Sequence, residues 1–388
     1  MTGTVDRATA RPLRVLHLLL WITAGGGGIQ SYLRGLLQAF RDAPGVRLLG
    51  AAVNPGPPDA GFDEPPYVGP TDAGRIRRAL QFGRHVRRAA RGADLVQING
   101  IYGPHFLLGA PCCWMLGVPY VVNPLNALAP WMLEQKALKK RLFFGTVGGF
   151  FLRKAACLLA TSEPEAEFLA RRFPRARTRL VRVGLAVPTE PRVRLLTEPP
   201  APQLRLLYLG SFDPWKRVPL LVRAVDELRA AGIDARAVIG GEGPATLMQP
   251  VREEIARRGV GQFVTMAGYV TGERKLELLR DAHALVLPSV TDSYSLASAE
   301  ALAQGLPVVL TEGSGAAPEI RRHDCGSVVP IEEGAAFVAA LREYADPAVR
   351  RRRALNAHRY AREVLDLPRL REGMTALYRE MAASKPQS

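Results

Sequence analysis

Two carboxylates stand eight residues apart around the expected start of a helix. Within residues 288–309, Asp292 lies in a loop and Glu300 lies in the first turns of the helix that follows. The amides of Ser295 and Leu296 come where that helix begins, and unpaired amides at such a point favour an anion. An acidic residue near a helix start also stabilises the helix by itself, by about 0.3–1 kcal/mol. That alternative explains Asp292 but not the whole string.

A second loop leads from a strand end to two adjacent cations. Gly210 and Ser211 follow the apolar run 205–209, and Lys216 and Arg217 come where the next helix is expected to begin. A glycine at the carboxyl end of a strand, followed by cations, suits a pyrophosphate. Lys216 supplies a point charge and Arg217 a planar fork. A solvated pair of cations without a ligand is the alternative for this loop taken alone.

A third loop, rich in glycine, separates an apolar run near the N-terminus from a helical pattern at residues 29–40. Gly26, Gly27 and Gly28 let the backbone approach a ligand there, and the start of the helix favours a phosphate. A tight turn without a ligand fits equally well. Asn54 stands where a dinucleotide-binding fingerprint needs an acidic residue, which disfavours a dinucleotide-dependent oxidoreductase.

Short apolar runs alternate with helical patterns along the chain, and this alternation predicts parallel sheets covered by helices on both faces. The proline-rich stretch 188–203 separates two such series, so we expect an α/β protein with domains at residues 12–190 and 204–350. The run 15–22 is expected to be the first strand rather than a signal peptide, because it contains His17 and leads straight into glycines. The other expected strands are 48–53, 94–98, 120–122, 157–160, 205–209, 235–239, 263–266, 284–287 and 307–310. The expected helices include 71–91, 163–172, 218–231, 244–258, 275–281 and 298–304.

Composition excludes several classes of protein. With 388 residues, 47% hydrophobic and 23% charged, the chain is neither disordered nor fibrous, and no run of about 20 apolar residues predicts a spanning helix. The four cysteines fit no zinc spacing and no disulfide framework, so we expect reduced thiols in a cytosolic protein. The net charge of +16 is uneven: residues 1–200 hold 27 basic and 13 acidic residues, whereas residues 201–350 hold 16 and 19. A nucleic-acid binder, a protein that rests on an anionic membrane, or an arginine-rich composition would each show an excess of this kind.

The segment around Asp292 and Glu300 resembles the Glu-x7-Glu signature of the retaining glycosyltransferases of family 4, which have the GT-B fold of two Rossmann-like domains facing across a cleft. Gly210 and Lys216 resemble the Gly-Arg-x4-Lys segment of that family. Residues 240–244 resemble its Gly-x-Gly-Pro turn. The segment 124–163 resembles a branch that acts in surface-polysaccharide assembly.

Four departures from the family pattern stand out. Asp292 is one methylene shorter than glutamate, Ser211 replaces an arginine of the diphosphate clamp, and Ser295 replaces a glycine. Asn126 lies where that branch carries an arginine, and His105 is the nearest candidate for the family's acceptor-side histidine; a structural histidine is the alternative. These departures keep a non-catalytic relative, acting as a partner or scaffold, open beside the enzyme.

The resemblance implies retaining sugar transfer from a nucleotide diphosphate sugar, with no metal and no cofactor. Lys216 and the loop amides would stabilise the leaving diphosphate, Glu300 would bind the ribose, and Asp292 would orient the sugar. These three residues are the candidate catalytic set. The further donor-binding candidates are Gly210, Ser211, Arg217, Gly268, Tyr269, Val270, Ser295 and Leu296, and the acceptor-side candidates are Gly26, Gly27, Gly28, His105 and Asn126.

The acceptor domain carries basic residues beside aromatic ones at positions 131–154, a mixture that suits an interfacial helix on an anionic leaflet. A helix packed on its own domain is the alternative. We expect a lipid-linked or saccharide acceptor in polysaccharide or glycoconjugate synthesis, no nucleic acid, and a cytoplasmic protein peripheral to the inner face of the cell membrane. The resemblance also implies that the helical segment 351–388 crosses back to the first domain.

Overall fold

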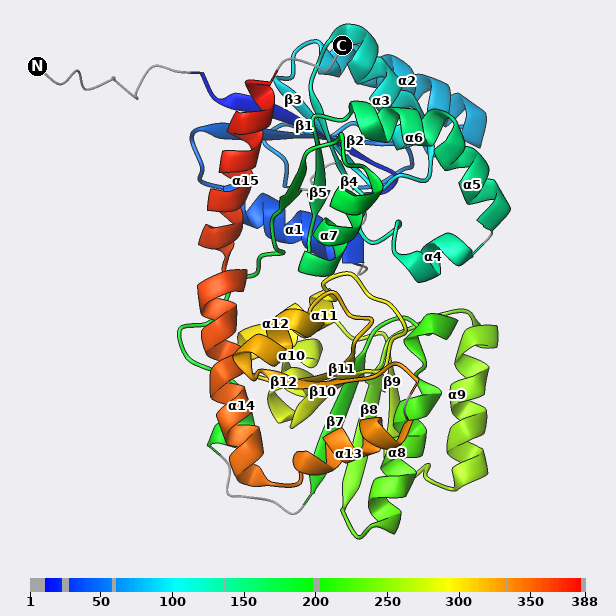
Figure 1. Cartoon of the computed structure of the whole chain (residues 1–388), viewed down its shortest axis with the longest axis vertical. Coiled ribbons are helices and arrows are strands. Elements are labelled where there is room, and N and C mark those ends of the chain that lie inside the picture. The colour runs from blue at the N-terminus through cyan, green and yellow to red at the C-terminus, as the bar shows by residue number, and fades with distance from the viewer. Residues whose placement is uncertain are drawn as a thin grey trace, which may run out of the picture. The chain divides into compact units, whose positions relative to one another are not determined.

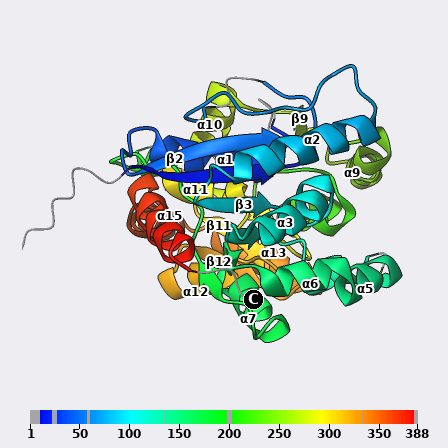
Figure 2. The same cartoon turned by 90° about the horizontal axis from the view of Figure 1, so that it is seen from above.

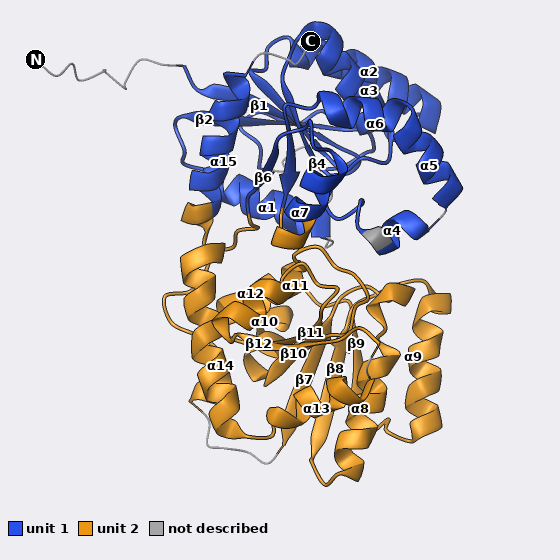
Figure 3. Ribbon diagram, viewed as in Figure 1, with its two compact units in different colours: residues 1–160, 166–181, 370–388 blue, residues 161–165, 182–369 orange. Residues whose placement is uncertain are grey.

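The computed structural model describes residues 11–22, 28–57, 61–135, 137–197, 203–332 and 334–384. The chain forms two compact units (Figures 1 and 3). Unit 1 comprises residues 1–160, 166–181 and 370–388, and unit 2 comprises residues 161–165 and 182–369. The main change of unit therefore falls between Val181 and Arg182, ahead of the proline-rich stretch, and the C-terminal residues belong to unit 1.

Unit 1 contains a six-stranded parallel sheet with the strand order β2-β1-β3-β4-β5-β6. Its strands are β1 (Leu13–Leu19), β2 (Val46–Ala52), β3 (Leu95–Asn99), β4 (Tyr120–Asn123), β5 (Cys157–Ala160) and β6 (Thr178–Leu180). The apolar runs were expected as strands at these places, apart from β6, which is only three residues long and partly exposed. The α/β class predicted for this half of the chain is confirmed.

Helices cover both faces of this sheet (Figures 1 and 2). They are α1 (Gly28–Phe40), α2 (Arg75–Ala90), α3 (Pro104–Leu116), α4 (Pro130–Glu134), α5 (Ala137–Gly145) and α6 (Val147–Lys154), together with most of α7 (Glu163–Arg172) and α15 (Leu367–Ala382). Helix α3 was not anticipated, because it is apolar all round and so has no helical periodicity. Pro104 in its first turn and the left-handed Gly117 at its end delimit it.

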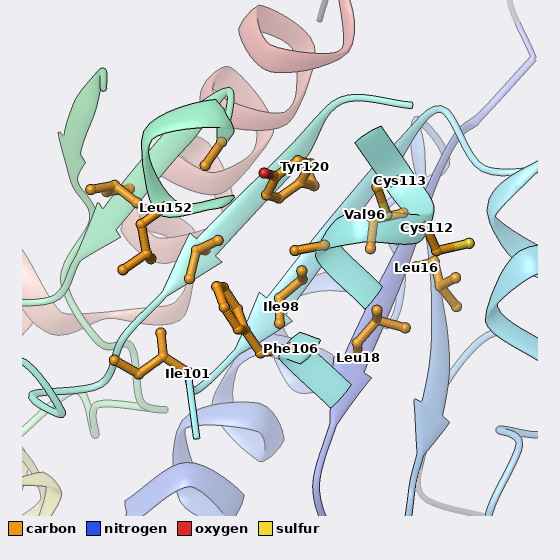
Figure 4. Close-up of a cluster of buried hydrophobic side chains, with 14 of the residues drawn as sticks. Leu16, Leu18, Val96, Ile98, Ile101, Phe106, Cys112, Cys113, Tyr120 and Leu152 are labelled. Atoms are coloured by element: carbon orange, nitrogen blue, oxygen red, sulfur yellow. The ribbon is translucent and has the colours of Figure 1, made fainter. Parts of the chain in front are cut away.

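One face of the unit 1 sheet holds an apolar core (Figure 4). Leu16 and Leu18 of β1 point to the same side because side chains alternate along a strand, and they pack with Phe106 of α3 and Leu152 of α6. All four cysteines of the chain are buried and unpaired. Burial raises the pKa of the Cys157 thiol to about 12, so this thiol stays protonated at neutral pH.

The opposite face of the same sheet buries uncharged polar side chains. Tyr378 of α15 donates a 2.8 Å hydrogen bond to Oε1 of Gln97, and Gln97 donates one of 2.9 Å to Oδ1 of Asn99. The His17 ring lies 3.4 Å from the Asn99 amide and 3.3 Å from the Tyr378 hydroxyl. Burial lowers the pKa of His17 to about 3, so the ring is neutral at pH 7. This network attaches the C-terminal helix to unit 1.

Unit 2 contains a second six-stranded parallel sheet, ordered β12-β11-β10-β7-β8-β9. Its strands are β7 (Leu204–Leu209), β8 (Ala235–Gly240), β9 (Val264–Gly268), β10 (Ala284–Leu287), β11 (Val308–Thr311) and β12 (Gly326–Val329). Its helices are α8 (Pro219–Ala230), α9 (Ala245–Arg258), α10 (Gly272–Asp281), α11 (Leu296–Gln304), α12 (Ala317–His323), α13 (Gly334–Glu343) and α14 (Pro347–Tyr360). The prediction of a second α/β sheet is confirmed.

Two segments differ from the expected helices. The basic aromatic segment 131–154 is not one helix but three, α4, α5 and α6. Near the C-terminus, a π-helix at Ala361–Leu365 follows α14, and the extended residue Asp366 separates it from α15. Pro368 lies in the first turn of α15, where a missing N–H costs little.

Candidate functional site

The reversal of strand order in unit 2 places two predicted loops side by side. Strand β7 pairs with β8 on one side and with β10 on the other. In open parallel sheets, ligands bind outside the carboxyl ends of the two strands at such a switch point. The loop that carries Lys216 follows β7, and the loop that carries Asp292 follows β10. A 2.7 Å hydrogen bond from the Val290 amide to the Trp215 carbonyl ties the loops together.

Lys216 and Asp292 form an ion pair at this switch point. The Lys216 Nζ lies 2.6 Å from Oδ2 of Asp292, and their side chains are 15% and 14% exposed. The Ser289 hydroxyl donates a longer hydrogen bond, 3.4 Å, to the same carboxylate oxygen. A cation held this far from bulk water interacts more strongly with an incoming anion than an exposed one does.

Glu300 is also paired, with a residue that the sequence did not single out. Lys275 of α10 places its Nζ 2.7 Å from Oε1 of Glu300, and the two side chains are 25% and 22% exposed. The partnership depends on the packing of α10 against α11, so no local spacing in the sequence indicates it.

Helix α11 begins between Asp292 and Glu300, the acidic members of these two ion pairs. Ser295 is its N-cap residue, is 8% exposed, and makes no side-chain capping hydrogen bond. The first amides of an α-helix have no acceptor within the helix. Leu296 and the residues after it therefore present donors and the positive end of the helix dipole at the carboxyl edge of the sheet.

Glycines line the neighbouring strand ends. The Gly210 amide donates a 3.0 Å hydrogen bond to the Gly240 carbonyl, and the Gly241 amide donates one of 2.7 Å to Gly268. Gly241 has φ of 151°, and a Cβ there would lie 1.8 Å from the Gly210 carbonyl oxygen. The backbones of the three strand ends thus approach one another closely, and Tyr269, which is 47% exposed, follows Gly268 directly. Val270 lies beside Gly240 in the same region.

Ser211 and Arg217 are engaged within unit 2. The Ser211 hydroxyl donates to Asp213, and the Ser211 carbonyl accepts from the buried Tyr208 hydroxyl. Arg217 adopts the left-handed conformation, with φ of 50°, and its guanidinium donates to the Ile331 carbonyl. The structure therefore brings Lys216 to Asp292 but records a different partner for Arg217.

A buried chain of hydrogen bonds supports the Asp292 loop, and sequence reasoning missed it. Tyr294, 1% exposed, lies with its hydroxyl 2.6 Å from the Tyr360 hydroxyl. Tyr360 donates to the buried carboxylate of Glu319, which also pairs with Arg182. Arg182 in turn lies 2.9 Å from Glu163. These residues are far apart in the sequence, so only the fold reveals that they act together.

The acceptor-side candidates lie in unit 1. Gly26 and Gly27 fall outside the described residues, and Gly28 is the first residue of α1. His105 lies in the first turn of α3 and is 2% exposed, and burial lowers its pKa to about 4. The ring is therefore neutral at pH 7 and packs against the loop that follows β3. Asn126 follows β4 in the left-handed conformation, with φ of 65°.

The described residues offer no metal site and no membrane-spanning helix. No group of three or more His, Cys, Asp or Glu side chains is arranged to hold a metal ion in that part of the chain. None of the helices seen there has the length and apolar content needed to cross a membrane.

Two family models match the chain. One described as "Glycosyl transferase 4-like domain" matches residues 27–184, and one described as "Glycosyl transferases group 1" matches residues 203–346. The D-inositol 3-phosphate glycosyltransferase of Streptomyces avermitilis is 29% identical over 220 residues, which cover 53% of this chain and 47% of that protein. The GDP-mannose-dependent alpha-(1-6)-phosphatidylinositol dimannoside mannosyltransferase of Mycobacterium tuberculosis is 30% identical, over 54% of this chain and 50% of that protein. The chain thus spans about half the length of these curated relatives.

Solved structures share the fold over almost the whole chain. Anabaena Alr3699/HepE, solved in complex with UDP and glucose, has a TM-score of 0.76 at 17% identity, covering 95% of this chain and 100% of that one. Sucrose-phosphate synthase from Thermosynechococcus elongatus has a TM-score of 0.74 at 20% identity, covering 96% and 100%. The family models, the relatives and the fold agree: the chain belongs to the group 1, family 4 glycosyltransferases and has the GT-B fold.

Proposed function

We propose that the chain is a retaining, metal-independent glycosyltransferase that moves a sugar from a nucleotide diphosphate sugar to a lipid-linked or saccharide acceptor. Unit 2 binds the donor and unit 1 binds the acceptor. The observation that carries the proposal is the ion pair between Lys216 and Asp292 at the switch point of the unit 2 sheet, next in sequence to the N-terminus of α11. Anabaena Alr3699/HepE, which shares this fold, was solved with UDP.

In this proposal the chain works mainly through electrostatics. The donor diphosphate replaces Asp292 as the partner of Lys216 and accepts hydrogen bonds from the first amides of α11. Charge that develops on the leaving diphosphate is then stabilised by donors already in place, a term worth about 3–4 kcal/mol for a single donor in other enzymes. Asp292, released from Lys216, is free to accept hydrogen bonds from the hydroxyls of the transferred sugar.

Glu300 has the matching role at the other end of the donor. Its carboxylate binds the ribose hydroxyls, with Lys275 holding it in place at 2.7 Å. At Gly268, where nothing lies within 4 Å of the position of a Cβ, the nucleotide has room to approach the backbone. The exposed ring of Tyr269 and the neighbouring Val270 contact the base.

The acceptor side is proposed to act at an anionic membrane, with the protein on the cytoplasmic side and peripheral to the inner face of the cell membrane. Helix α5 buries none of its residues, and Leu138 and Leu142 on it are 81% and 68% exposed. Lys139 and Arg141 of the same helix are exposed as well. Apolar side chains beside cations suit the boundary between headgroups and acyl chains. The matching pathway is polysaccharide or glycoconjugate synthesis.

Thermal melting with nucleoside diphosphates tests the donor half of this function. We expect one of UDP, GDP, dTDP and ADP to raise the melting temperature by several degrees at about a hundred times its dissociation constant. The Glu300→Ala variant is expected to lose that shift, while a matched Glu253→Ala variant on α9 keeps it. A shift with NAD or NADP alone would contradict the proposal. No change in melting temperature with any of these ligands would favour a non-catalytic relative that acts as a partner or scaffold.

Sedimentation with vesicles tests the membrane half. We expect the protein to bind vesicles that contain anionic lipid and to release them as the salt concentration rises, because exposed charges are screened. Equal binding to neutral and anionic vesicles would contradict a role for the basic unit.

A further inference from the structure

Unit 1 contains a cavity of about 600 Å³ built from α4, α5, α6 and the end of α7, a volume in the range of small-molecule sites. Its lining divides into two chemical sets. The apolar set is Leu128, Leu133, Ala137, Phe144, Gly145 and Phe173, and the charged set is Lys140, Arg141, Arg153, Arg172 and Glu134. Four cations against one carboxylate give the cavity a net positive charge.

Two of these cations are held in position. The Lys140 ammonium donates to the Met132 carbonyl and lies 5.3 Å from the centre of the Tyr102 ring. The Arg172 guanidinium lies 5.4 Å from the centre of the Phe173 ring. Cations held by backbone and ring contacts lose less freedom when an anion binds than cations on mobile side chains do.

The three arginines have no carboxylate within ion-pair distance among the described residues. They are set apart by lining one cavity together with Lys140. Like charges gathered around one cavity repel each other unless an anion lies between them.

Two glycines in α6 allow the cavity to form. A Cβ at Gly149 would lie 1.9 Å from the Phe144 carbonyl oxygen, and one at Gly148 would lie 2.2 Å from the Phe143 ring. Glycine at both positions therefore lets α5 approach α6 closely and turn its basic residues toward the cavity. Glycine weakens an isolated helix, so close helix packing offsets that cost here.

We propose that this cavity binds the phosphate or diphosphate group of a lipid-linked acceptor, with the lipid chain lying along the exposed Leu138 and Leu142 of α5. The proposal rests on the proposed function and specifies the chemistry of its acceptor. Arginine matches phosphate oxygens in pairs, and lysine adds a point charge. The apolar wall of Leu128, Leu133 and Phe144 meets the first carbons of the chain. Inorganic phosphate has no apolar surface to bury against these side chains, so the lining favours a phosphorylated lipid over inorganic phosphate.

Titration calorimetry of the full chain with farnesyl diphosphate tests the proposal. Farnesol and inorganic pyrophosphate, which carry only the lipid part and only the charged part of that ligand, are titrated separately. We expect farnesyl diphosphate to bind at least tenfold more tightly than either half. The double variant Arg153→Gln/Arg172→Gln is expected to weaken that binding at least tenfold. Arg47→Gln changes an exposed arginine on β2, at the opposite edge of the unit 1 sheet, and is expected to leave it unchanged.

Three results would overturn the proposal. Binding of pyrophosphate as tight as that of farnesyl diphosphate would show that the apolar wall plays no part and that the cavity is a simple anion site. Equal weakening by Arg47→Gln would show a general effect of charge. Loss of binding in Lys216→Met, with the cavity variants unaffected, would place the ligand at the donor site instead.

A parallel measurement separates this proposal from the proposed function. The melting shift with nucleoside diphosphates is recorded for each cavity variant, and we expect it to be retained because it reports on unit 2. A retained shift also shows that the variant is folded. If the nucleotide shift is absent from the parent protein while farnesyl diphosphate still follows Arg153 and Arg172, the transferase proposal fails and the lipid-phosphate site stands.

Discussion

The two sheets have the same number of parallel strands but differ in the chemistry at their carboxyl edges. In unit 2, the switch point ends in ion pairs, Lys216 with Asp292 and nearby Lys275 with Glu300. In unit 1, β3 and β4 end in the buried amides Asn99 and Asn123. Charged groups suit a diphosphate, and neutral groups suit the hydroxyls of a sugar. The proposed function therefore assigns two kinds of ligand to one framework, because residues at the strand ends change with little effect on the sheet.

The buried hydrogen-bond networks of the two units show the same contrast between neutral and charged groups. Unit 1 buries a neutral network around His17, Gln97 and Tyr378, whereas unit 2 buries a charged one around Arg182 and Glu319. A buried charge is costly when its partner is removed, but a neutral hydrogen bond contributes only about 1 kcal/mol. The unit proposed to bind the nucleotide diphosphate is thus the unit in which the loop carrying Asp292 is supported by buried charge.

Removing the Lys216 cation should produce the largest effect. We expect Lys216→Met to lower kcat/KM about 100- to 1000-fold, because the leaving diphosphate loses a preorganised donor. The steady-state rate of sugar transfer measures this. Arg236→Met, an exposed arginine of β8 in the same sheet, is the control and is expected to keep full activity. A similar loss of kcat/KM in both variants would show that Lys216 has no special role at the switch point.

Removing one partner from each buried network tests the second contrast. Arg182→Met leaves the Glu319 carboxylate buried beside Tyr360 without its cation, and we expect the free energy of unfolding to fall by about 3 kcal/mol. Tyr378→Phe removes a neutral hydroxyl from the unit 1 network, with an expected loss of about 1 kcal/mol. Urea unfolding measures both. A larger loss in Tyr378→Phe would reverse the contrast between the units.

The pH dependence of stability tests whether the buried network of unit 1 is neutral. Burial lowers the pKa of His17 to about 3, below its ordinary value of 6.5, so the unfolded chain takes up a proton that the folded chain does not. Stability is therefore lost as the pH falls below about 6.5, by about 2 kcal/mol for this residue between pH 6.5 and pH 5. His17→Gln should remove that part of the loss. An unchanged pH profile in the variant would show that the ring is charged in the folded protein.

The smallest effect is expected at Asp292, and its sign is informative. Asp292→Ala frees Lys216 from its internal partner, so we expect a nucleoside diphosphate without sugar to bind a few-fold more tightly. Sugar transfer should nevertheless fall, because the transferred sugar loses the carboxylate that orients it. Calorimetry and rate measurements check the two halves, with Asp213→Ala in the neighbouring loop as the control. Weaker nucleotide binding in Asp292→Ala would mean that Asp292 does not compete for Lys216.

The strands and the loops after them were predictable because they depend on local patterns. Runs of apolar residues gave β1 and β7, and the loops that carry Lys216 and Asp292 were placed at strand ends from glycine, charge and spacing. Helix α3 was not predicted, because a helix that is apolar all round has no helical periodicity in its sequence.

The partners within the site were not predictable in the same way. Lys275 reaches Glu300 only because α10 packs on α11, and Glu319 reaches Tyr360 across 41 positions in the sequence. Nothing in the local sequence marks either contact. The site candidates themselves remain predictions, although the structure brings Lys216 and Asp292 together.

We propose that the charged edge of unit 2 binds a diphosphate, and calorimetry of the parent protein and of Lys216→Met decides whether it does. The ligands are a nucleoside diphosphate, the corresponding monophosphate and the nucleoside. We predict that the diphosphate binds the parent at least tenfold more tightly than the monophosphate, and that Lys216→Met removes this difference. Equal affinity for the diphosphate and the monophosphate in the parent, or a preference that survives in Lys216→Met, would contradict the account.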